Sequence, residues 1–297
     1  MVQLKWYNIF IRHTTYLIRL KNGKEDNMTE KILKILKEQG VRLASPISLA
    51  DCKIIKKHKL EKVGICGTEG YFAVMLAIPY LTPHKKRNLS AYAVSRDYHL
   101  FFSELFASVL PELKRNFPEN IFVGFADDSP IEERDAAAKA GLGILGDNGM
   151  LITKDYSSYV FLGEIITDLP LECTANEIEH CMGCGVCKRA CPMGEIGQCL
   201  SALTQKKGEL TDSEREAIKK YGSVWGCDRC QELCPHTLRA IKCESIYTDL
   251  EFFKRDSVGL LTSSILDSMT DEEFASRAYS WRGRQTIGRN LEILEND

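Results

Sequence analysis

The sequence predicts a mixed α/β domain in the first half of the chain, a small cysteine-rich domain after it and a short helical tail. Three apolar runs of strand length, at 72–80, 121–125 and 159–167, alternate with helical patterns. Eight cysteines with short spacings lie between 181 and 235. At 297 residues the chain is long enough to bury a substantial core and to divide into more than one domain.

Residues 1–27 are interpreted as an N-terminal extension. The stretch 21–27 is polar and turn-rich, and an amphipathic pattern begins at Met28. Segment 7–20 is moderately apolar, but Arg12 and Arg19 interrupt it, and no small-residue cleavage pattern follows. We therefore expect no signal peptide and no membrane span.

Residues 28–170 are expected to form a mixed α/β domain. Its pattern of strands and helices fits either the α/β or the α+β class. The run 72–80 is apolar at almost every position, which fits a buried central strand better than a half-exposed one. The expected elements are a helix over 29–40, a loop or short strand over 43–49, a surface helix over 53–62, strands over 72–80, 121–125 and 159–167, one or two helices over 89–117, and a helix over 131–140.

Two adjacent carboxylates, Asp127 and Asp128, follow the second of these strands. Residues at the ends of strands often carry the chemistry of α/β folds, which makes the pair a candidate for catalysis. The simpler interpretation is a helix N-cap, because Asp is a preferred capping residue. Both roles can coexist, one on each residue.

A glycine-spaced loop follows the helix at 131–140. Gly141, Gly143 and Gly146 match G-x-G-x-x-G, the spacing of a dinucleotide-binding loop. That motif must follow a strand and open a helix, whereas here it follows a helix, so binding of NAD is disfavoured. The glycines still allow the backbone to approach another group closely.

The cysteines of segment 171–245 form two short motifs. The first is C-x2-C-x2-C-x3-C-P and the second is C-x2-C-x3-C-P, with one further cysteine between them. In two-cluster ferredoxins three thiolates of such a motif bind one iron–sulfur cluster and the fourth binds the other. By that analogy one 4Fe-4S cluster takes Cys181, Cys184, Cys187 and Cys234, and the other takes Cys191, Cys199, Cys227 and Cys230.

A pair of zinc sites is the alternative for these cysteines, because C-x2-C pairs also build zinc ribbons. Zinc ribbons use two separated pairs and do not need three thiols within seven residues. The segment is therefore predicted to be a double-cluster, ferredoxin-like domain. Four other cysteines receive no role, since a free cysteine is most often a small buried hydrophobe; they are Cys52, Cys66, Cys173 and Cys243.

Residues 246–297 are expected to form the helical tail. Thr270 is a candidate N-cap before an acidic first turn. Four arginines could contact phosphate or could simply be helix-surface charges, and both interpretations stay open. They are Arg277, Arg282, Arg284 and Arg289.

Composition limits the classes of function. Apolar residues make up 44% of the chain and charged residues 27%, as in ordinary globular proteins. The formal net charge of -2 provides no overall basic field, so a nucleic-acid contact would need a local patch. Cysteines in cluster spacing favour a reducing, cytoplasmic location over a disulfide scaffold.

These motifs together resemble the epoxyqueuosine reductase family, whose members are cobalamin and iron–sulfur enzymes that complete queuosine in transfer RNA and are related to reductive dehalogenases. The resemblance extends over 71–294. The matching stretches are Ala77-Ile-Pro-Tyr80, Arg96-Asp-Tyr-His99, Asp127-Asp-Ser-Pro130 with Glu133-Arg134, Ala140-Gly-Leu-Gly-Ile-Leu-Gly-Asp-Asn148, Cys199-Leu-Ser-Ala-Leu-Thr204, Gly226-Cys-Asp-Arg-Cys-Gln231, Arg282-Gly-Arg284 and Arg289-Asn290.

The resemblance implies a cobalamin between the α/β domain and the cluster domain, and an oxidoreductase that reduces epoxyqueuosine in tRNA. It implies Asp127 as the proton donor. Contacts with the corrinoid are then expected from Gly141, Gly143, Gly146, Asn148 and Leu151. An external donor such as flavodoxin or ferredoxin would supply electrons, and we expect a monomer.

Opening an epoxide with loss of its oxygen as water takes two electrons and two protons, so the reaction needs both an electron source and an acid. An aspartate with a pKa near 3.9 is ionised at neutral pH. Burial, or repulsion from Asp128, would raise the pKa of one carboxyl group into a useful range for an acid.

The chain departs from the family pattern in three places. Asp128 and Ser129 stand where the family has Ser and Gly, and only seven residues separate Cys191 from Cys199. The sequence also ends without the family's HEAT-like repeats, which help to hold tRNA. Two alternatives therefore remain: a corrinoid iron–sulfur reductase of a small molecule, and a ferredoxin-like electron carrier with no active site of its own.

Overall fold

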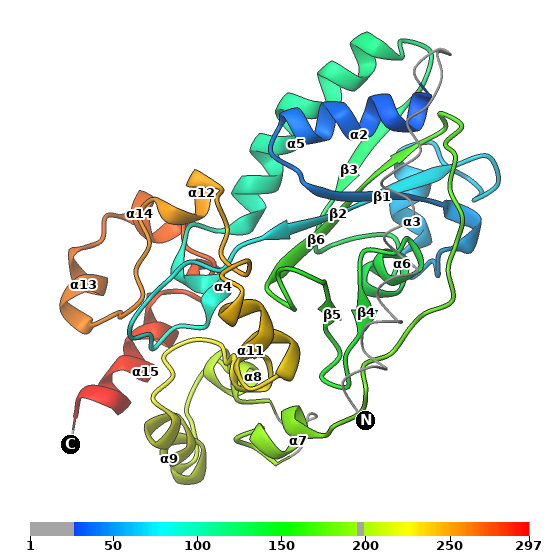
Figure 1. Cartoon of the computed structure of the whole chain (residues 1–297). Helices are drawn as coiled ribbons and strands as arrows, with labels where there is room; N and C mark the ends of the chain where they lie inside the picture. Colours follow the sequence, from blue (N-terminus) through cyan, green and yellow to red (C-terminus); the bar gives the residue numbers. More distant parts are fainter. Residues whose placement is uncertain (1–26, 195–198, 297) are drawn as a thin grey trace.

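Four strands form one antiparallel sheet in this structure, a computed structural model that describes residues 27–194 and 199–296. The strand order is β1-β2-β6-β3, and all neighbours are antiparallel (Figure 1). The strands are β1 (Leu43–Ser48), β2 (Phe72–Pro79), β6 (Val160–Thr167) and β3 (Phe122–Phe125). The three predicted strands are confirmed, and the open choice at 43–49 is resolved in favour of a strand.

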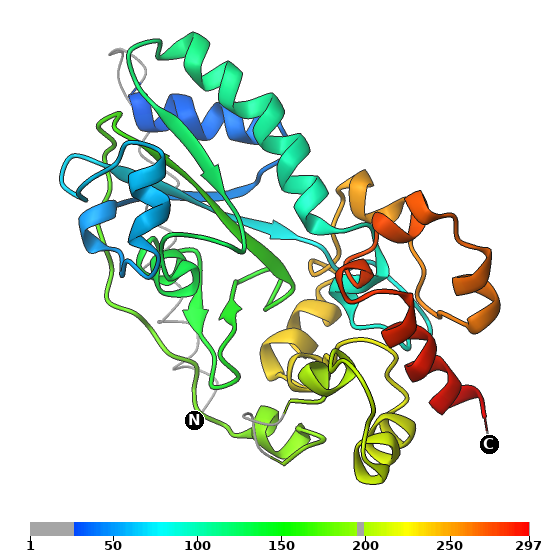
Figure 2. The same ribbon diagram turned by 180° about the vertical axis from the view of Figure 1, so that it is seen from behind.

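Helices cover both faces of this sheet, which explains why β2 is apolar along its length (Figures 1 and 2). On one face Val74 and Leu76 pack with residues of α2 (Met28–Glu38) and α5 (Tyr98–Asn116). On the other face Met75 packs with residues of α3 (Lys57–Lys62) and α6 (Glu133–Lys139). Such a run is typical of parallel strands between helical layers, but two-sided cover produces it in an antiparallel sheet as well.

The aromatic-rich stretch at 89–117 forms two helices, α4 (Ala91–Val94) and α5. Asp97 separates them, because its side chain accepts the backbone N–H of His99 and caps α5. Phe101 and Phe102 are buried in the core below the helix, as expected. The cap places Tyr98 and His99 in the first turn of α5, at the edge of the sheet.

The glycine-rich stretch after α6 forms a short hairpin that the sequence pattern does not predict. Strand β4 (Ile144–Leu145) pairs with β5 (Leu151–Ile152). Gly143 has no room for a side chain, because a Cβ there would lie 2.4 Å from the Ile152 carbonyl oxygen. Strands of two residues are too short to leave an alternating pattern in the sequence.

The second half of the chain is rich in short helices (Figure 1). Its core contains Trp225, Tyr279 and Ile287, together with Leu89 and Val94 from the first half. The remaining helical elements are η2 (Leu49–Asp51), α7 (Val186–Ala190), α8 (Leu200–Thr204), α9 (Asp212–Tyr221), α10 (Arg229–Glu232), α11 (Pro235–Lys242), α12 (Glu251–Lys254), α13 (Ser263–Ser268), α14 (Asp271–Ala275), η3 (Ser280–Arg282) and α15 (Arg284–Glu295). The domain limits at 170 and 245 stay a prediction, and hydrophobic packing is continuous across them.

Most of the arginines of the tail bind the protein's own backbone. Arg277 donates to the Asp256 carbonyl, Arg284 to the Leu266 and Met269 carbonyls at 2.7 Å each, and Arg289 to the Lys206 carbonyl at 2.8 Å. Their use is therefore structural, and the open phosphate-binding interpretation loses support.

Two sequence predictions concern the ends and the membrane. The predicted extension at 1–27 lies outside the described residues except for Asn27, whose side chain caps α2. Among the described residues, every helix is too short or too polar to traverse a bilayer.

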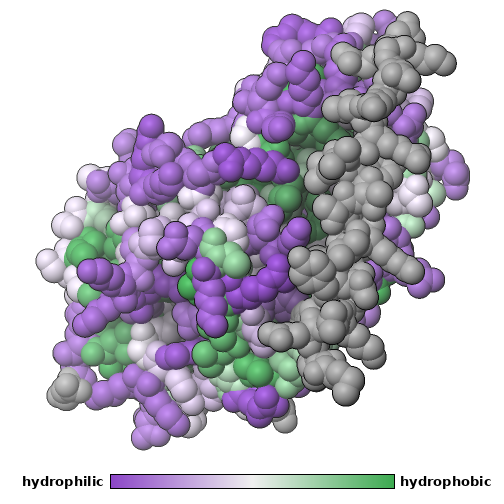
Figure 3. All heavy atoms as spheres, viewed as in Figure 1, coloured by the Kyte–Doolittle hydropathy of each residue, from purple (hydrophilic) through white to green (hydrophobic). Residues whose placement is uncertain are grey.

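The face in Figure 3 is mainly hydrophilic, with a hydrophobic area over α8 and α11. On α11, Leu238 and Ile241 are exposed.

Candidate functional site

Four cysteines from the two motifs line one open pocket. They are Cys181, Cys184, Cys187 and Cys234, the set that the spacing assigns to the first cluster. The β4–β5 hairpin forms the opposite side through Gly146, Asp147, Asn148 and Ile152. In residues 27–194 and 199–296 no three His, Cys, Asp or Glu side chains converge as they would around a single metal ion.

Backbone hydrogen bonds hold the hairpin against the first cysteine. The Cys181 N–H donates to the Leu145 carbonyl at 2.8 Å, and the Asp147 N–H donates to the Cys181 sulfur at 3.3 Å. Hydrogen bonds to ligand sulfurs are one of the means by which a protein adjusts the potential of an iron–sulfur cluster. The hairpin therefore contacts the first cysteine of the first motif.

The motif proline has a local structural role at the last cysteine. Cys234 is the N-cap of α11, and Pro235 is the first residue of that helix, where its missing N–H costs nothing. Between the first cysteines, Gly183 and Gly185 have φ angles of 64° and 69°. Only glycine adopts this left-handed conformation freely, so the loop can wind tightly enough to present several thiols.

The structure brings together part of the second predicted set of cysteines. The thiols of Cys227 and Cys199 lie close enough to Cys230 to act on it electrostatically, and burial, together with these neighbours, raises the pKa of Cys230 to about 12. Cys187 of the first set acts on Cys230 too, so the two groups of thiols are adjacent. Cys191 ends α7, which packs against α10.

A buried ion pair joins the second motif to the first half of the chain. Arg87 donates to Asp228 at 3.0 Å and to Glu232 at 2.9 Å, and the Ala91 N–H donates to Asp228 at 2.6 Å. Asp228 stands between Cys227 and Cys230 in the sequence. Burial raises the pKa of Asp228 to about 6, and the Arg87 charge opposes this rise.

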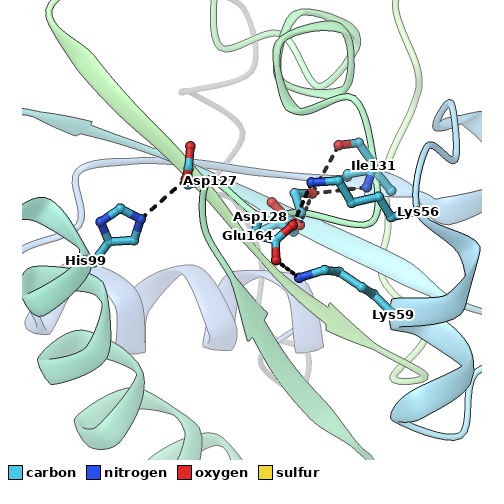
Figure 4. Close-up of polar contacts among 8 residues, drawn as sticks. Lys56, Lys59, His99, Asp127, Asp128, Ile131 and Glu164 are labelled. Carbon is cyan, nitrogen blue, oxygen red and sulfur yellow. Dashed lines mark hydrogen bonds and ion pairs between the residues drawn. The ribbon is translucent and has the colours of Figure 1, made fainter. Parts of the chain in front are cut away.

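Asp127 lies two residues beyond the end of β3, in a left-handed conformation with a φ of 63°. Aspartate tolerates this region better than most residues, although it remains strained for any side chain other than glycine. Its carboxylate faces the first turn of α5: His99 Nε2 lies 3.4 Å from Asp127 Oδ2, and the Tyr98 side chain hydrogen-bonds the same carboxylate. Figure 4 shows Asp127 directed toward His99.

The sequence predicts a raised pKa for one carboxyl group of the Asp127–Asp128 pair, but the pKa of both is lowered. The hydrogen bond from His99 lowers the pKa of Asp127 below its ordinary value and outweighs the effect of burial. The bonds to Asp127 and Asp97 raise the pKa of His99 to about 10. His99 is therefore an imidazolium at neutral pH and Asp127 a carboxylate, so that the pair holds one proton between them.

Asp128 has a different environment from its neighbour. Lys56 donates to Asp128 Oδ1 at 2.6 Å, and Lys59 contacts the other oxygen (Figure 4). These bonds lower the pKa of Asp128 to about 2. Asp128 is thus a paired surface anion. Nor does either aspartate cap α6, whose N-cap is Glu132 without a side-chain bond, so the N-cap interpretation is wrong.

Sequence reasoning gave no functional role to two glutamates that lie close to the Asp127 turn. Glu164 lies in the middle of β6, opposite Met75 of β2 and Phe125 of β3, and is 0% exposed. It hydrogen-bonds Glu133, the first residue of α6. A signal was present, because a single carboxylate within the apolar run 160–167 is expensive to bury.

An aromatic series connects the Asp127 site with the second cysteine motif. Tyr98 stacks on Phe161 at 4.4 Å between ring centroids, Phe161 stacks on Tyr80 at 4.2 Å, and Tyr80 meets Tyr159 edge to face at 5.8 Å. Tyr159 hydrogen-bonds Arg87, which binds Asp228. The candidate acid and the cysteine loops thus belong to one contiguous packed structure.

The predicted corrinoid contacts lie in different surroundings. Gly146 and Asn148 line the pocket, and Asn148 Nδ2 is buried without a hydrogen-bond partner among the described residues. Leu151 is buried in the core, and a Cβ on Gly141 would lie 3.3 Å from Asn176 Nδ2. The orphaned amide and the cysteine-lined wall fit a bound group at the pocket, whereas Gly141 and Gly143 are accounted for by the protein's own packing.

Several known proteins are similar in sequence to this chain. An epoxyqueuosine reductase of Synechocystis sp. is 31% identical over 220 residues, which cover 68% of this chain and 76% of that protein. The chain belongs to the epoxyqueuosine reductase family. Further members from Listeria monocytogenes and Gloeobacter violaceus are 34% identical over 209 and 194 residues, covering 67% and 63% of this chain. No protein-family model matches the chain.

The match to these family members is partial along their length. The aligned chain spans 54% of the Listeria protein and 61% of the Gloeobacter protein. Among solved structures, an epoxyqueuosine reductase with an epoxyqueuosine-modified tRNA-Tyr stem loop has a TM-score of 0.69 and 24% identity, covering 89% of this chain and 80% of that one. The structure from Streptococcus thermophilus has a TM-score of 0.65 at 24% identity, covering 90% and 80%. These likenesses establish the mixed α/β fold of the family.

Proposed function

We propose that this chain is an oxidoreductase that reduces the epoxide of epoxyqueuosine in tRNA to give queuosine. The observation that carries the proposal is the pocket in which four cysteines from both motifs face the glycine hairpin. Family membership supports the substrate, and the solved relative with an epoxyqueuosine-modified tRNA stem loop supports tRNA as its carrier.

The proposed cofactors are two 4Fe-4S clusters and a cobalamin. The first cluster would be held by Cys181, Cys184, Cys187 and Cys234, and the second by Cys191, Cys199, Cys227 and Cys230. When bound, these groups supply one-electron carriers and a redox-active cobalt, which the side chains of the protein lack. The Asp147 N–H would then serve the sulfur of a cluster ligand, and Gly146 and Asn148 would border the corrinoid. Residues 28–170 act as the corrinoid-binding domain and 171–245 as the ferredoxin-like domain in this proposal.

Asp127 would deliver a proton to the departing epoxide oxygen. At neutral pH the proton resides on His99, whose Nε2 faces Asp127 Oδ2 at 3.4 Å. As negative charge develops on the oxygen, the His99 imidazolium would give its proton to Asp127, and Asp127 would pass that proton on to the oxygen. The Tyr98 hydroxyl and the Asp97 carboxylate hold the carboxylate and the imidazole in this alignment.

The proposal includes a cytoplasmic monomer that takes electrons from a flavodoxin or ferredoxin. A second candidate, reduction of a small-molecule epoxide with the same cofactors, is favoured by one observation. Arg277, Arg284 and Arg289 bind backbone carbonyls, which leaves fewer cations for the phosphates of RNA. An electron carrier without an active site remains the third candidate.

Anaerobic reconstitution with iron, sulfide and cobalamin separates these candidates. We expect about eight irons per chain, tight cobalamin binding, and turnover on epoxyqueuosine-containing tRNA that exceeds turnover on the free nucleoside. Activity on the nucleoside alone would favour the small-molecule reductase. A protein that binds both clusters but no cobalamin would be a carrier, and a zinc-loaded protein would refute all three.

A further inference from the structure

The two buried glutamates form an unusual feature of the sheet. Glu164 projects from β6 on the face covered by α6, where its neighbours on adjacent strands are Met75 and Phe125. Its Oε1 accepts a hydrogen bond from Ser129 Oγ at 2.5 Å. The Ser129 hydroxyl also accepts the Ile131 N–H at 3.0 Å, so it is oriented by the loop that carries Asp127.

The side chains of the two glutamates are close enough to hydrogen-bond each other. Glu133 Oε1 and Glu164 Oε2 are both buried and have no donor among the residues described. Two carboxylate oxygens in this position repel unless a proton lies between them. Burial and the Glu133 charge raise the pKa of Glu164 well above its ordinary value, whereas burial and the Asp127 charge raise the pKa of Glu133 to about 7. A hydrogen bond between two carboxyl groups requires a proton on one of them, so once Glu133 is ionised, above about pH 7, the pair holds one proton, on Glu164.

The pair is connected to Asp127 through the backbone. The Asp127 N–H hydrogen-bonds the Glu133 carboxylate, at the residue whose φ is 63°. A hydrogen bond to an ionised carboxylate is roughly twice as strong as one to a neutral group. The protonation state of the pair thus decides how firmly the strained turn at Asp127 is held.

Other charged groups act on the pair as well. Asp127 and Glu132 face Glu133, and Lys56, on the segment that leads into α3, also lies within reach of Glu133. The Cys52 thiol lies near Glu164. Of these, Lys56 is held by Asp128 and stays cationic. Cys52, with a pKa of about 12, stays neutral, so the proton on the glutamate pair is the one that exchanges near neutrality.

We propose that Glu133 and Glu164 are positioning residues that share one proton, and that the free Glu133 carboxylate holds the Asp127 turn in its working conformation. The inference rests on the proposed role of Asp127 as the acid. It predicts that kcat rises as the pH increases through about 7, because ionised Glu133 grips the Asp127 amide more strongly, while KM changes little.

The test uses infrared spectroscopy on the chain labelled with carbon-13 glutamate, and turnover of the reconstituted enzyme across pH. At pH 8 the unmodified chain should show the band of a protonated glutamate, and Glu164→Gln should lack it. Glu133→Gln should lose the rise of kcat through pH 7 and run roughly five- to tenfold slower at pH 8, from the exchange of a charged for a neutral acceptor. Asp135→Asn removes a different carboxylate from the first turn of the same helix, and is expected to keep both the band and the pH profile.

Each outcome has one meaning. Absence of the protonated band at pH 8 overturns the shared proton, and this readout requires neither substrate nor cofactor. Retention of the pH-dependent rise in Glu133→Gln overturns the link to Asp127. Glu164→Gln keeps a neutral donor beside Glu133 and should retain the rise of kcat through pH 7. Loss of that rise in this variant overturns the link even if Glu133→Gln fails to fold. If Asp127→Asn keeps full turnover, the acid role fails while the infrared result still stands.

Discussion

Replacing Arg87 by methionine tests how the cysteine loops are attached to the sheet. Arg87 and Asp228 have side chains that are 16% and 4% exposed, so their ion pair is largely removed from water. Loss of one partner of a buried pair typically costs about 3–5 kcal/mol, because the remaining charge stays buried. The Ala91 N–H still stabilises Asp228, which places the expected loss near the lower end, at about 3 kcal/mol. For a chain of this size 1 kcal/mol shifts the unfolding midpoint by roughly 2 °C, so Arg87→Met should lower it by about 6 °C.

The assay is anaerobic thermal unfolding of the reconstituted protein, followed by circular dichroism and by cluster absorption. Arg87→Met combined with Asp228→Asn removes the stranded charge and should recover part of the loss. Arg115→Met is the matched control, because its ion pair with Glu112 is exposed and should be worth less than about 1 kcal/mol. A shift below about 2 °C for Arg87→Met, or no recovery in the double variant, would refute the reasoning.

Three further predictions concern the site itself. Asp127→Asn retains a side chain that tolerates a left-handed backbone and should keep both clusters and the corrinoid, while turnover falls by roughly 10²–10⁴-fold; undiminished turnover would contradict the acid role. The same variant removes the main partner of His99, so an NMR titration should show the pKa of His99 falling from about 10 toward its ordinary value. Because the folded pKa lies above 6.5, the stability contributed by this pairing is complete below that pH and is lost as the pH rises through about 10, and an unchanged titration would count against the pairing. Cys184→Ala should lower the iron content from about eight toward four per chain, whereas Cys52→Ala, which removes a buried thiol with a pKa of about 12, should leave it unchanged; equal iron in both variants would remove Cys184 from the ligands.

Much of the fold could be predicted because its signals are local. The apolar runs at 72–80 and 159–167 are strands, and the predicted first helix ends just before Gly40. The antiparallel pairing could not be predicted in this way, because a strand covered on both faces is apolar whichever direction its neighbours run. The hairpin at 144–152 could not be predicted, because each of its strands has only two residues.

The candidate site, like the fold, could be predicted only where its signals are local in the sequence. Spacing identifies cysteines that can serve one cluster, since a ligand loop of a few residues is shaped by its own backbone, and the pocket gathers the four that spacing assigned together. Spacing alone could not reveal the glycine hairpin on the other wall of that pocket.

The sequence by itself determined the thiol motifs, the strands and the position of Asp127 after β3, because these depend on residues close together in the chain. Only the tertiary structure decided the charges at the site. His99 lies 28 residues from Asp127 in sequence, Lys56 lies 72 from Asp128, and Ser129 lies 35 from Glu164. A carboxyl pKa responds to burial and to neighbouring charges and hydrogen bonds within a few ångströms, and those neighbours come from segments that only folding brings together.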